Sequence, residues 1–115
     1  SSAGRVFLAY AVAASELSKF LGKGALRAYT AKTPTDRSEL TRLVEKIRVD
    51  GFSVNEQFLT ETVCGVSAPI FDAASKLVGT ITLSAPAGRF DIKKDQLVSE
   101  VVSCANSISL ICGLQ

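Results

Sequence analysis

The hydrophobic periodicity changes at Gly51, and this change limits the possible fold more than any other feature of the sequence. Before it, apolar side chains recur every three or four residues from Leu40 to Ile47, the spacing of an amphipathic helix. Asp36 followed by Glu39 is a variant of the capping box that begins helices. The sequence therefore predicts a helix that starts at Asp36 and ends at Gly51.

Three strands are predicted after this helix, over residues 52–57, 63–71 and 77–85. The polar turn 72–76 joins the last two strands. Pro69 has no amide proton, which limits how far the middle strand can pair on both sides.

Helices are expected on either side of these strands. The apolar spacing predicts one helix over residues 4–13 and a long amphipathic helix over residues 91–112. A short helix is predicted from Ser15, as its cap, to Leu21, with an apolar side that includes Phe20. The expected fold class is α+β, with an antiparallel sheet flanked by helices. Because no cap is evident before Gly4, we expect the domain to be truncated at its N-terminal side.

Composition narrows the class of function. The 115 residues suit one small domain, and 47% hydrophobic with 21% charged residues is typical of a globular chain. A net charge of +2 is too small for a nucleic-acid-binding surface. No apolar run approaches the ~20 residues that span a membrane, so no membrane contact is expected.

Cysteine and histidine content bears on catalysis and metals. Cys64, Cys104 and Cys112 form no CxxC pair, which indicates neither a zinc site nor a disulfide framework and is typical of a cytoplasmic protein. Histidine is absent, which removes the commonest general base and metal ligand. We expect no catalytic residues, no metal and no cofactor. Gly22-Lys23-Gly24 lacks the spacing of a phosphate-binding loop.

The third strand carries the most informative side chains. Alternation places Val78, Thr80, Thr82 and Ser84 on one face, and Ile81 and Leu83 on the other. A half-exposed strand that uses threonine for its β propensity explains this pattern. The row of hydroxyls also suits the floor of a pocket for a small polar ligand.

Five segments stand out for their sequence and order: Ser2–Tyr10, Tyr29–Asp36, Gly51–Ser53, Cys64–Asp72 and Leu83–Phe90. Taken in this order, they resemble motifs of the IclR family of bacterial transcriptional regulators. The resemblance implies a GAF-like effector-binding domain that binds a small organic acid or related metabolite between its sheet and helices. It also implies a homodimer or tetramer, and a winged helix-turn-helix domain before Ser1 that alone contacts DNA. Residues 1–115 are then a partial effector-binding domain.

Carried over residue by residue, the resemblance implies seven ligand-binding positions. They are Ser2, Ala3, Asn55, Val63, Gly65, Thr82 and Ser84. Three depart from the family pattern: Asn55 replaces a common Asp, Gly65 replaces a frequent Cys, and Thr82 replaces Ser. An amide at position 55 adds donors and removes negative charge, which favours a carboxylate ligand. In a water-poor pocket, a hydrogen bond from the Ser84 hydroxyl to the carboxylate of such a ligand would be charge-assisted.

Two other functions fit the same sequence. One is a structural oligomerisation module whose pocket is vestigial. The other is an enzyme with Cys64 or Ser84 as nucleophile and a base such as Lys76, which the absence of histidine disfavours.

Overall fold

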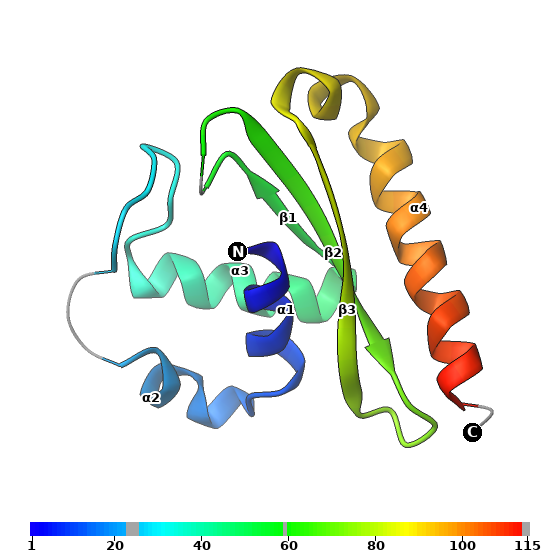
Figure 1. Cartoon of the computed structure of the whole chain (residues 1–115). Helices are drawn as coiled ribbons and strands as arrows, with labels where there is room; N and C mark the ends of the chain where they lie inside the picture. The colour runs from blue at the N-terminus through cyan, green and yellow to red at the C-terminus, as the bar shows by residue number, and fades with distance from the viewer. Residues whose placement is uncertain (23–25, 59, 114–115) are drawn as a thin grey trace.

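The computed structural model describes residues 1–22, 26–58 and 60–113. In these residues an antiparallel sheet of order β1-β2-β3 is covered by α4 on one face and by α1 on the other, with α3 packed against α1 (Figure 1). The predicted α+β class is confirmed. The elements are α1 (Ser2–Tyr10), a 3-10 turn (Ala14–Glu16), α2 (Leu17–Leu21), α3 (Arg37–Asp50), β1 (Ser53–Glu56), β2 (Val63–Phe71), β3 (Leu77–Pro86) and α4 (Ala87–Gly113).

The strand register follows the alternation of the sequence. Ser67 of β2 lies opposite Ser53 of β1 on one side and Thr82 of β3 on the other. The β1 pairing ends at Ser67, so Pro69 pairs only with β3 and its missing amide proton breaks no ladder. The expected limit on central pairing is confirmed.

Two hydrophobic clusters hold the layers together. The first lies between the sheet and α4, and its buried members are Cys64, Val66, Ala68, Phe90, Val101 and Ala105. The second joins α1, α2 and α3 through Ala9, Leu17, Val44 and Ile47. Each face of the sheet therefore has its own helical cover, and the polar rows of the sheet face α1.

The start of α1 differs from the sequence prediction. The Ser1 hydroxyl accepts a hydrogen bond from the Gly4 amide at 3.0 Å and caps the helix. The helix begins at Ser2, two residues earlier than predicted, and ends at Tyr10. The expectation that nothing caps this helix is wrong.

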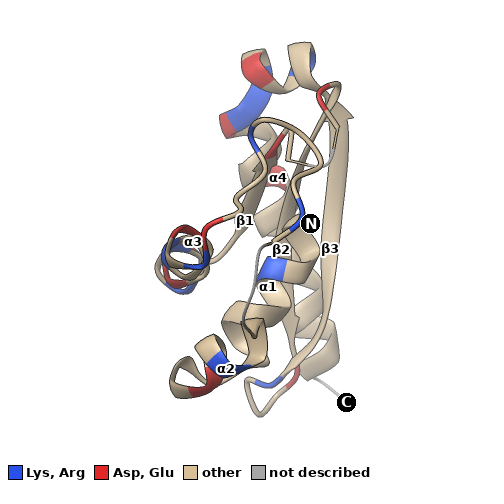
Figure 2. Cartoon of the chain, turned by 90° about the vertical axis from the view of Figure 1, so that its left-hand side faces the viewer, with Lys and Arg blue, Asp and Glu red and all other residues tan. Residues whose placement is uncertain are grey.

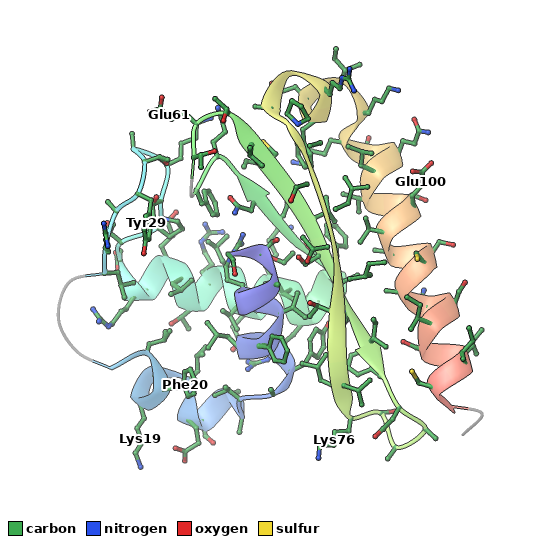
Figure 3. All side chains as sticks on the ribbon, viewed as in Figure 1. Lys19, Phe20, Tyr29, Glu61, Lys76 and Glu100 are labelled. Atoms are coloured by element: carbon green, nitrogen blue, oxygen red, sulfur yellow. The ribbon has the colours of Figure 1, made fainter. Side chains whose placement is uncertain are left out.

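The short second helix also differs in two respects. Ser15 lies inside the 3-10 turn and caps nothing, although Gly22 ends the helix with a positive φ of 72°. Phe20 is 68% exposed instead of belonging to the apolar side (Figure 3). Leu17 alone of this helix is buried. Lys23 and Gly24 of the dismissed phosphate-loop match lie outside the described residues.

Helix α3 follows the prediction at both ends. Asp36 accepts from the Ser38 amide at 2.8 Å, and Gly51 adopts the left-handed conformation that ends many helices. Its polar face carries residues of both charges (Figure 2), and most of them are exposed. Arg48 is an exception, because its guanidinium donates to the carbonyls of Ala9 and Val12 and so fixes the end of α1.

Helix α4 begins at Ala87, four residues before the predicted start, and therefore follows β3 directly. Among the described residues, α4 is the one helix that is long enough and apolar enough, judged by length and composition alone, to cross a membrane. The prediction of no membrane span overlooked this helix because its apolar residues are spaced and not contiguous. Mostly buried core helices of soluble proteins meet the same criterion, whereas the apolar stretch of α4 is only 11% buried in this chain. The helix buries Phe90, Val101 and Ala105 against the sheet.

Candidate functional site

The sheet brings polar positions of all three strands to one face. Asn55 of β1, Gly65 of β2 and Ser84 of β3 lie opposite one another in the ladder. Residues paired across a sheet project to the same side, and Ile81 and Leu83 pack on the opposite side against the α4 cluster. The predicted division of β3 into an apolar face and a hydroxyl face is confirmed.

All seven positions that the family resemblance implied meet at one cavity of about 240 Å³, which we call the hydroxyl cavity. The first turn of α1 forms one wall and the three strands form the floor and the opposite wall. Its lining residues are Ser1, Ser2, Ala3, Asn55, Thr60, Val63, Cys64, Gly65, Thr82 and Ser84. None of these side chains carries a charge at neutral pH.

A chain of three hydroxyls connects the helix to the sheet beside this cavity. Ser2 Oγ lies 2.7 Å from Ser67 Oγ, which lies 2.7 Å from Thr82 Oγ1. Ser67 is fully buried and was not among the predicted positions. The period-two alternation that places Val63 and Gly65 on this face also places Ser67 there, so the signal was present in the sequence.

Gly65 leaves room between two hydroxyl groups. A Cβ atom built there would lie 3.6 Å from Ser2 Oγ and 3.9 Å from Ser84 Oγ, in ordinary van der Waals contact. The missing side chain therefore contributes directly to the space of the hydroxyl cavity.

Asn55 presents its amide group in a defined orientation. Its Oδ1 accepts a hydrogen bond from the Phe58 amide at 2.8 Å, and the residue is 8% exposed. Among the described residues the Nδ2 group has no hydrogen-bond partner, and its two donors are available to the cavity that Asn55 lines. An aspartate here would offer an acceptor and negative charge in the same place.

Backbone donors lie at the same end of the hydroxyl cavity. Ser2 and Ala3 are the first two residues of α1, and amides of a first helical turn have no partner within the helix. Their N–H groups and the helix dipole favour negative charge. The amide of Asn55, the hydroxyls of β3 and this helix start together form a set of donors suited to an anion.

The cavity is buried on one side and open on the other. Ser2, Asn55 and Gly65 are buried, whereas Thr82 and Ser84 on β3 are exposed. β3 is the last strand of the sheet in the described residues, and its outer edge faces no other described strand. The expectation of a water-poor pocket therefore holds for the floor but is wrong for the β3 wall.

Cys64 contributes only to the margin of the cavity. It belongs to the hydrophobic cluster beneath α4 and is 2% exposed. Burial raises the pKa of its thiol and outweighs the backbone hydrogen bond from Gln57, which lowers that pKa. The thiol is protonated at neutral pH, which disfavours a role as nucleophile.

The catalytic alternative fails on geometry as well. Lys76 lies in the turn before β3, whereas Ser84 is near the other end of that strand (Figure 3). Eight residues of extended chain separate their backbones by roughly 26 Å. In the described part of the chain no group of three or more metal-ligating side chains comes together.

Comparison with known proteins identifies the family. The family model described as "Bacterial transcriptional regulator IclR C-terminal" matches residues 1–110. The repressor AllR of Klebsiella pneumoniae is 33% identical over 119 aligned residues, which cover 100% of this chain and 42% of AllR. The chain spans 30% and 42% of the first two curated relatives that it matches.

Solved structures agree with this assignment. Thermotoga maritima IclR, known from a crystal structure, has 31% sequence identity to this chain and superposes on it with a TM-score of 0.82. The match covers 98% of this chain and 46% of the Thermotoga chain. The PobR inducer-binding domain from Acinetobacter, solved with 3-hydroxybenzoic acid, is 17% identical over 95% of this chain and 63% of its own, with a TM-score of 0.84. The latter shows the fold alone.

The chain is thus a mixed α and β domain of the kind found in transcriptional regulators. It belongs to the IclR family, as the C-terminal domain. Its relatives are transcriptional regulators and not enzymes.

Proposed function

We propose that this domain binds a small organic carboxylate in the hydroxyl cavity and thereby acts as the effector-binding domain of a transcriptional regulator. The observation that carries the proposal is the convergence of all seven expected positions on one cavity. Its donors come from three sources: the first amides of α1, Asn55 Nδ2 and the hydroxyls of Thr82 and Ser84.

The character of the cavity supports a small anion in particular. Its volume of about 240 Å³ is below the roughly 300–1,000 Å³ typical of pockets for drug-sized ligands. With no acidic side chain in the lining, no negative charge there opposes a carboxylate. The donors can then form charge-assisted hydrogen bonds to it. The PobR domain, whose fold is similar, was solved with an organic acid.

We further propose that the full-length protein has a helix-turn-helix DNA-binding domain outside residues 1–115, through which alone it contacts DNA. AllR is a helix-turn-helix repressor, and this chain covers 42% of it. The ligand can regulate DNA binding if it binds one arrangement of the effector domains more tightly than another. By thermodynamic linkage, the factor by which the ligand changes the affinity for DNA equals the factor by which DNA changes the affinity for the ligand.

The proposal includes assembly and location. We expect a homodimer or tetramer in the cytoplasm, where a regulator meets both DNA and metabolites. Leu110 and Ile111 near the end of α4 are 72% and 60% exposed, which suits burial against a partner. A purely structural oligomerisation module would show the same exposed residues but would not bind carboxylates.

The test uses the full-length protein and pairs of ligands that differ only in charge. Short carboxylic acids of two to six carbons and the primary amides of the same skeletons are titrated calorimetrically. The result expected is saturable binding of at least one acid and no binding of its amide. Operator DNA affinity measured with and without that acid should change. If no acid binds, or if acid and amide bind equally, the proposal is wrong.

A further inference from the structure

Arg5 is a buried cation without an acidic partner in the described residues. It is 6% exposed, and its nearest contacts are the Val54 carbonyl, to which Nη2 donates at 2.6 Å, and the Phe58 ring 4.9 Å from its Cζ. No carboxylate of the described chain lies within ion-pair distance of it. A guanidinium has five N–H donors, and one hydrogen bond leaves most of them unused.

Burying a charge in this way is costly unless something compensates it. Burial lowers the pKa of Arg5 to about 10, so the group still carries its charge at neutral pH. The Phe58 ring and one carbonyl compensate only part of a full positive charge.

Arg5 lines a second cavity, of about 510 Å³, that runs along β1 between α3 and the start of α4. We call it the Arg5 cavity. It shares no lining residue with the hydroxyl cavity. Its basic residues are Arg5, Lys32, Lys46 and Lys94, against two acidic residues, Asp50 and Glu56.

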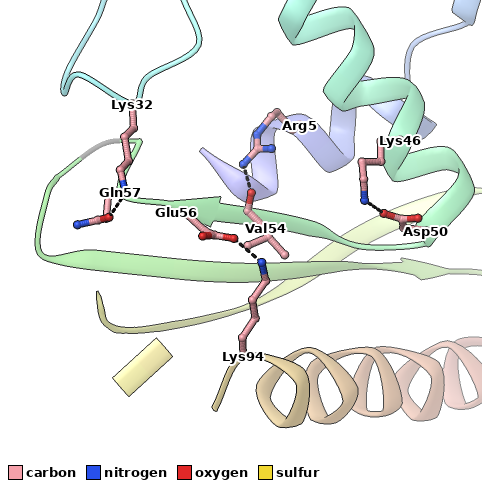
Figure 4. A network of polar contacts seen from close by, with 8 residues as sticks. All are labelled: Arg5, Lys32, Lys46, Asp50, Val54, Glu56, Gln57 and Lys94. Carbon is pink, nitrogen blue, oxygen red and sulfur yellow. Dashed lines mark hydrogen bonds and ion pairs between the residues drawn. The ribbon is translucent and has the colours of Figure 1, made fainter. Parts of the chain in front are cut away.

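The two carboxylates of the Arg5 cavity are already neutralised. Lys46 pairs with Asp50 and Lys94 pairs with Glu56 (Figure 4). Lys32 donates to the neutral amide oxygen of Gln57 at 2.6 Å. Two positive charges, on Arg5 and Lys32, therefore remain without an acidic partner among the described residues.

A buried hydroxyl in the same cavity also lacks a partner. Ser53 is 1% exposed and lines the Arg5 cavity, and its Oγ makes no hydrogen bond within the described residues. Buried hydroxyls are nearly always hydrogen-bonded. The remaining walls are apolar, with Leu43 and Ile47 from α3 and Phe52 and Phe58 beside β1.

We propose that the Arg5 cavity is a second ligand site, which takes an organic anion: a carboxylate or phosphate group attached to an apolar body. Arg5 and Lys32 contact the anionic group, and the apolar body lies against α3. The ligand is larger than that of the hydroxyl cavity, because the available volume is about 510 Å³ against about 240 Å³.

Phenylphosphate is a suitable probe, because it combines an anionic group with an apolar ring and is not a carboxylate of the kind proposed for the hydroxyl cavity. We expect saturable calorimetric binding of phenylphosphate to the full-length protein, and weaker binding of inorganic phosphate, which lacks the apolar body. Arg5→Gln should weaken the probe at least ten-fold. Lys32→Gln, at an exposed position where folding is not at risk, should weaken it about three-fold.

Two controls separate this site from its surroundings. Lys76→Gln removes an equally exposed lysine from the β2–β3 turn and should leave probe affinity unchanged. Ser84→Ala alters only the hydroxyl cavity and should also leave probe affinity unchanged. The proposal for the Arg5 cavity can therefore be rejected without rejecting the proposal for the hydroxyl cavity. Absence of probe binding overturns the inference. Wild-type affinity in Lys32→Gln, or loss of binding in Ser84→Ala, overturns it too.

Discussion

Gly65 lies directly opposite Ser84 in the β2–β3 ladder, and a Cβ atom on Gly65 would lie 3.9 Å from the Ser84 hydroxyl. The same Cβ would lie 3.6 Å from the Ser2 hydroxyl on α1. Because Gly65 has no side chain, the space between these two hydroxyls stays open in the hydroxyl cavity.

Replacing Gly65 by alanine should therefore reduce ligand affinity without harming the fold. Gly65→Ala adds a methyl group that would lie 3.4 Å from the Leu83 carbonyl oxygen, at the near end of ordinary contact, and would occupy space that a ligand would fill. We expect affinity for the carboxylate to fall at least about five-fold. Gly79→Ala on β3, where an added Cβ meets nothing within 4 Å, is the matched control. Equal affinities in the two variants would show that no ligand occupies this space.

Asn55 provides a test of charge. Asn55→Asp keeps the shape and the acceptor for the Phe58 amide but places negative charge beside a bound carboxylate, so binding at pH 7 should weaken by about ten-fold. The deficit should shrink as the pH falls toward the ordinary aspartate pKa of about 3.9, because the protonated side chain is neutral. Calorimetric titrations at pH 7 and pH 5 measure both effects. Asn106→Asp, on the exposed side of α4, should bind as wild type does at each pH.

Leu83 should affect stability and not binding. Its side chain packs in the cluster beneath α4, on the face opposite Ser84, and it lies across from the fully buried Val66. Because Leu83 is only partly buried, Leu83→Ala should cost about 1–3 kcal/mol of unfolding free energy, less than the 2–5 kcal/mol of a buried leucine. Urea unfolding measures this, with exposed Val78→Ala as control. A stable Leu83→Ala variant that no longer binds ligand would reverse our assignment of the two faces.

Cys64 should be slow to react and dispensable for ligand binding. Burial raises its thiol pKa, so it stays protonated at pH 7.5, whereas Cys104 is exposed. Mass spectrometry after iodoacetamide treatment should find Cys104 modified first and Cys64 last. Since the folded state resists thiolate formation, stability should fall as the pH rises above the ordinary thiol pKa of about 8.5. Cys64→Ser should keep ligand affinity within a few-fold; preferential alkylation of Cys64 would contradict this account.

The features that the sequence predicted are those that depend on local spacing. The end of α3 at Gly51, the two faces of β3 and the partial pairing of Pro69 follow from periodicity and backbone chemistry alone. The seven cavity positions came from family resemblance, and alternation independently supported Thr82 and Ser84 among them. The same alternation places Ser67 on the cavity face of β2.

What could not be predicted depends on contacts between distant segments. Burial of Arg5 results from the packing of α1 over β1, and the neighbouring sequence has no sign of it. Phe20 fits a helical apolar side, yet its helix is too short to bring it to the core. The cap by Ser1 was missed because α1 begins earlier than its apolar residues suggested.

The most direct test of the hydroxyl cavity compares hydroxyls on one face of one strand. Ser84 and Thr82 line the cavity, whereas Thr80 lies on the same face of β3 but outside it. In the full-length protein, Ser84→Ala and Thr82→Val should each weaken carboxylate binding by about five- to ten-fold. This corresponds to about 1–1.4 kcal/mol, less than for a fully buried charge-assisted bond because this wall is exposed.

Thr80→Val makes the same chemical change and should bind as wild type does. The decisive measurement is calorimetric titration of these three variants and the wild type with one carboxylate, beside their unfolding curves. Our account predicts reduced affinity in Ser84→Ala at unchanged stability. It predicts reduced affinity in Thr82→Val together with a loss of about 0.5–1.5 kcal/mol of unfolding free energy, because Thr82 Oγ1 is hydrogen-bonded to the buried Ser67. Wild-type affinity in both of these variants, or an equal loss in Thr80→Val, would contradict it.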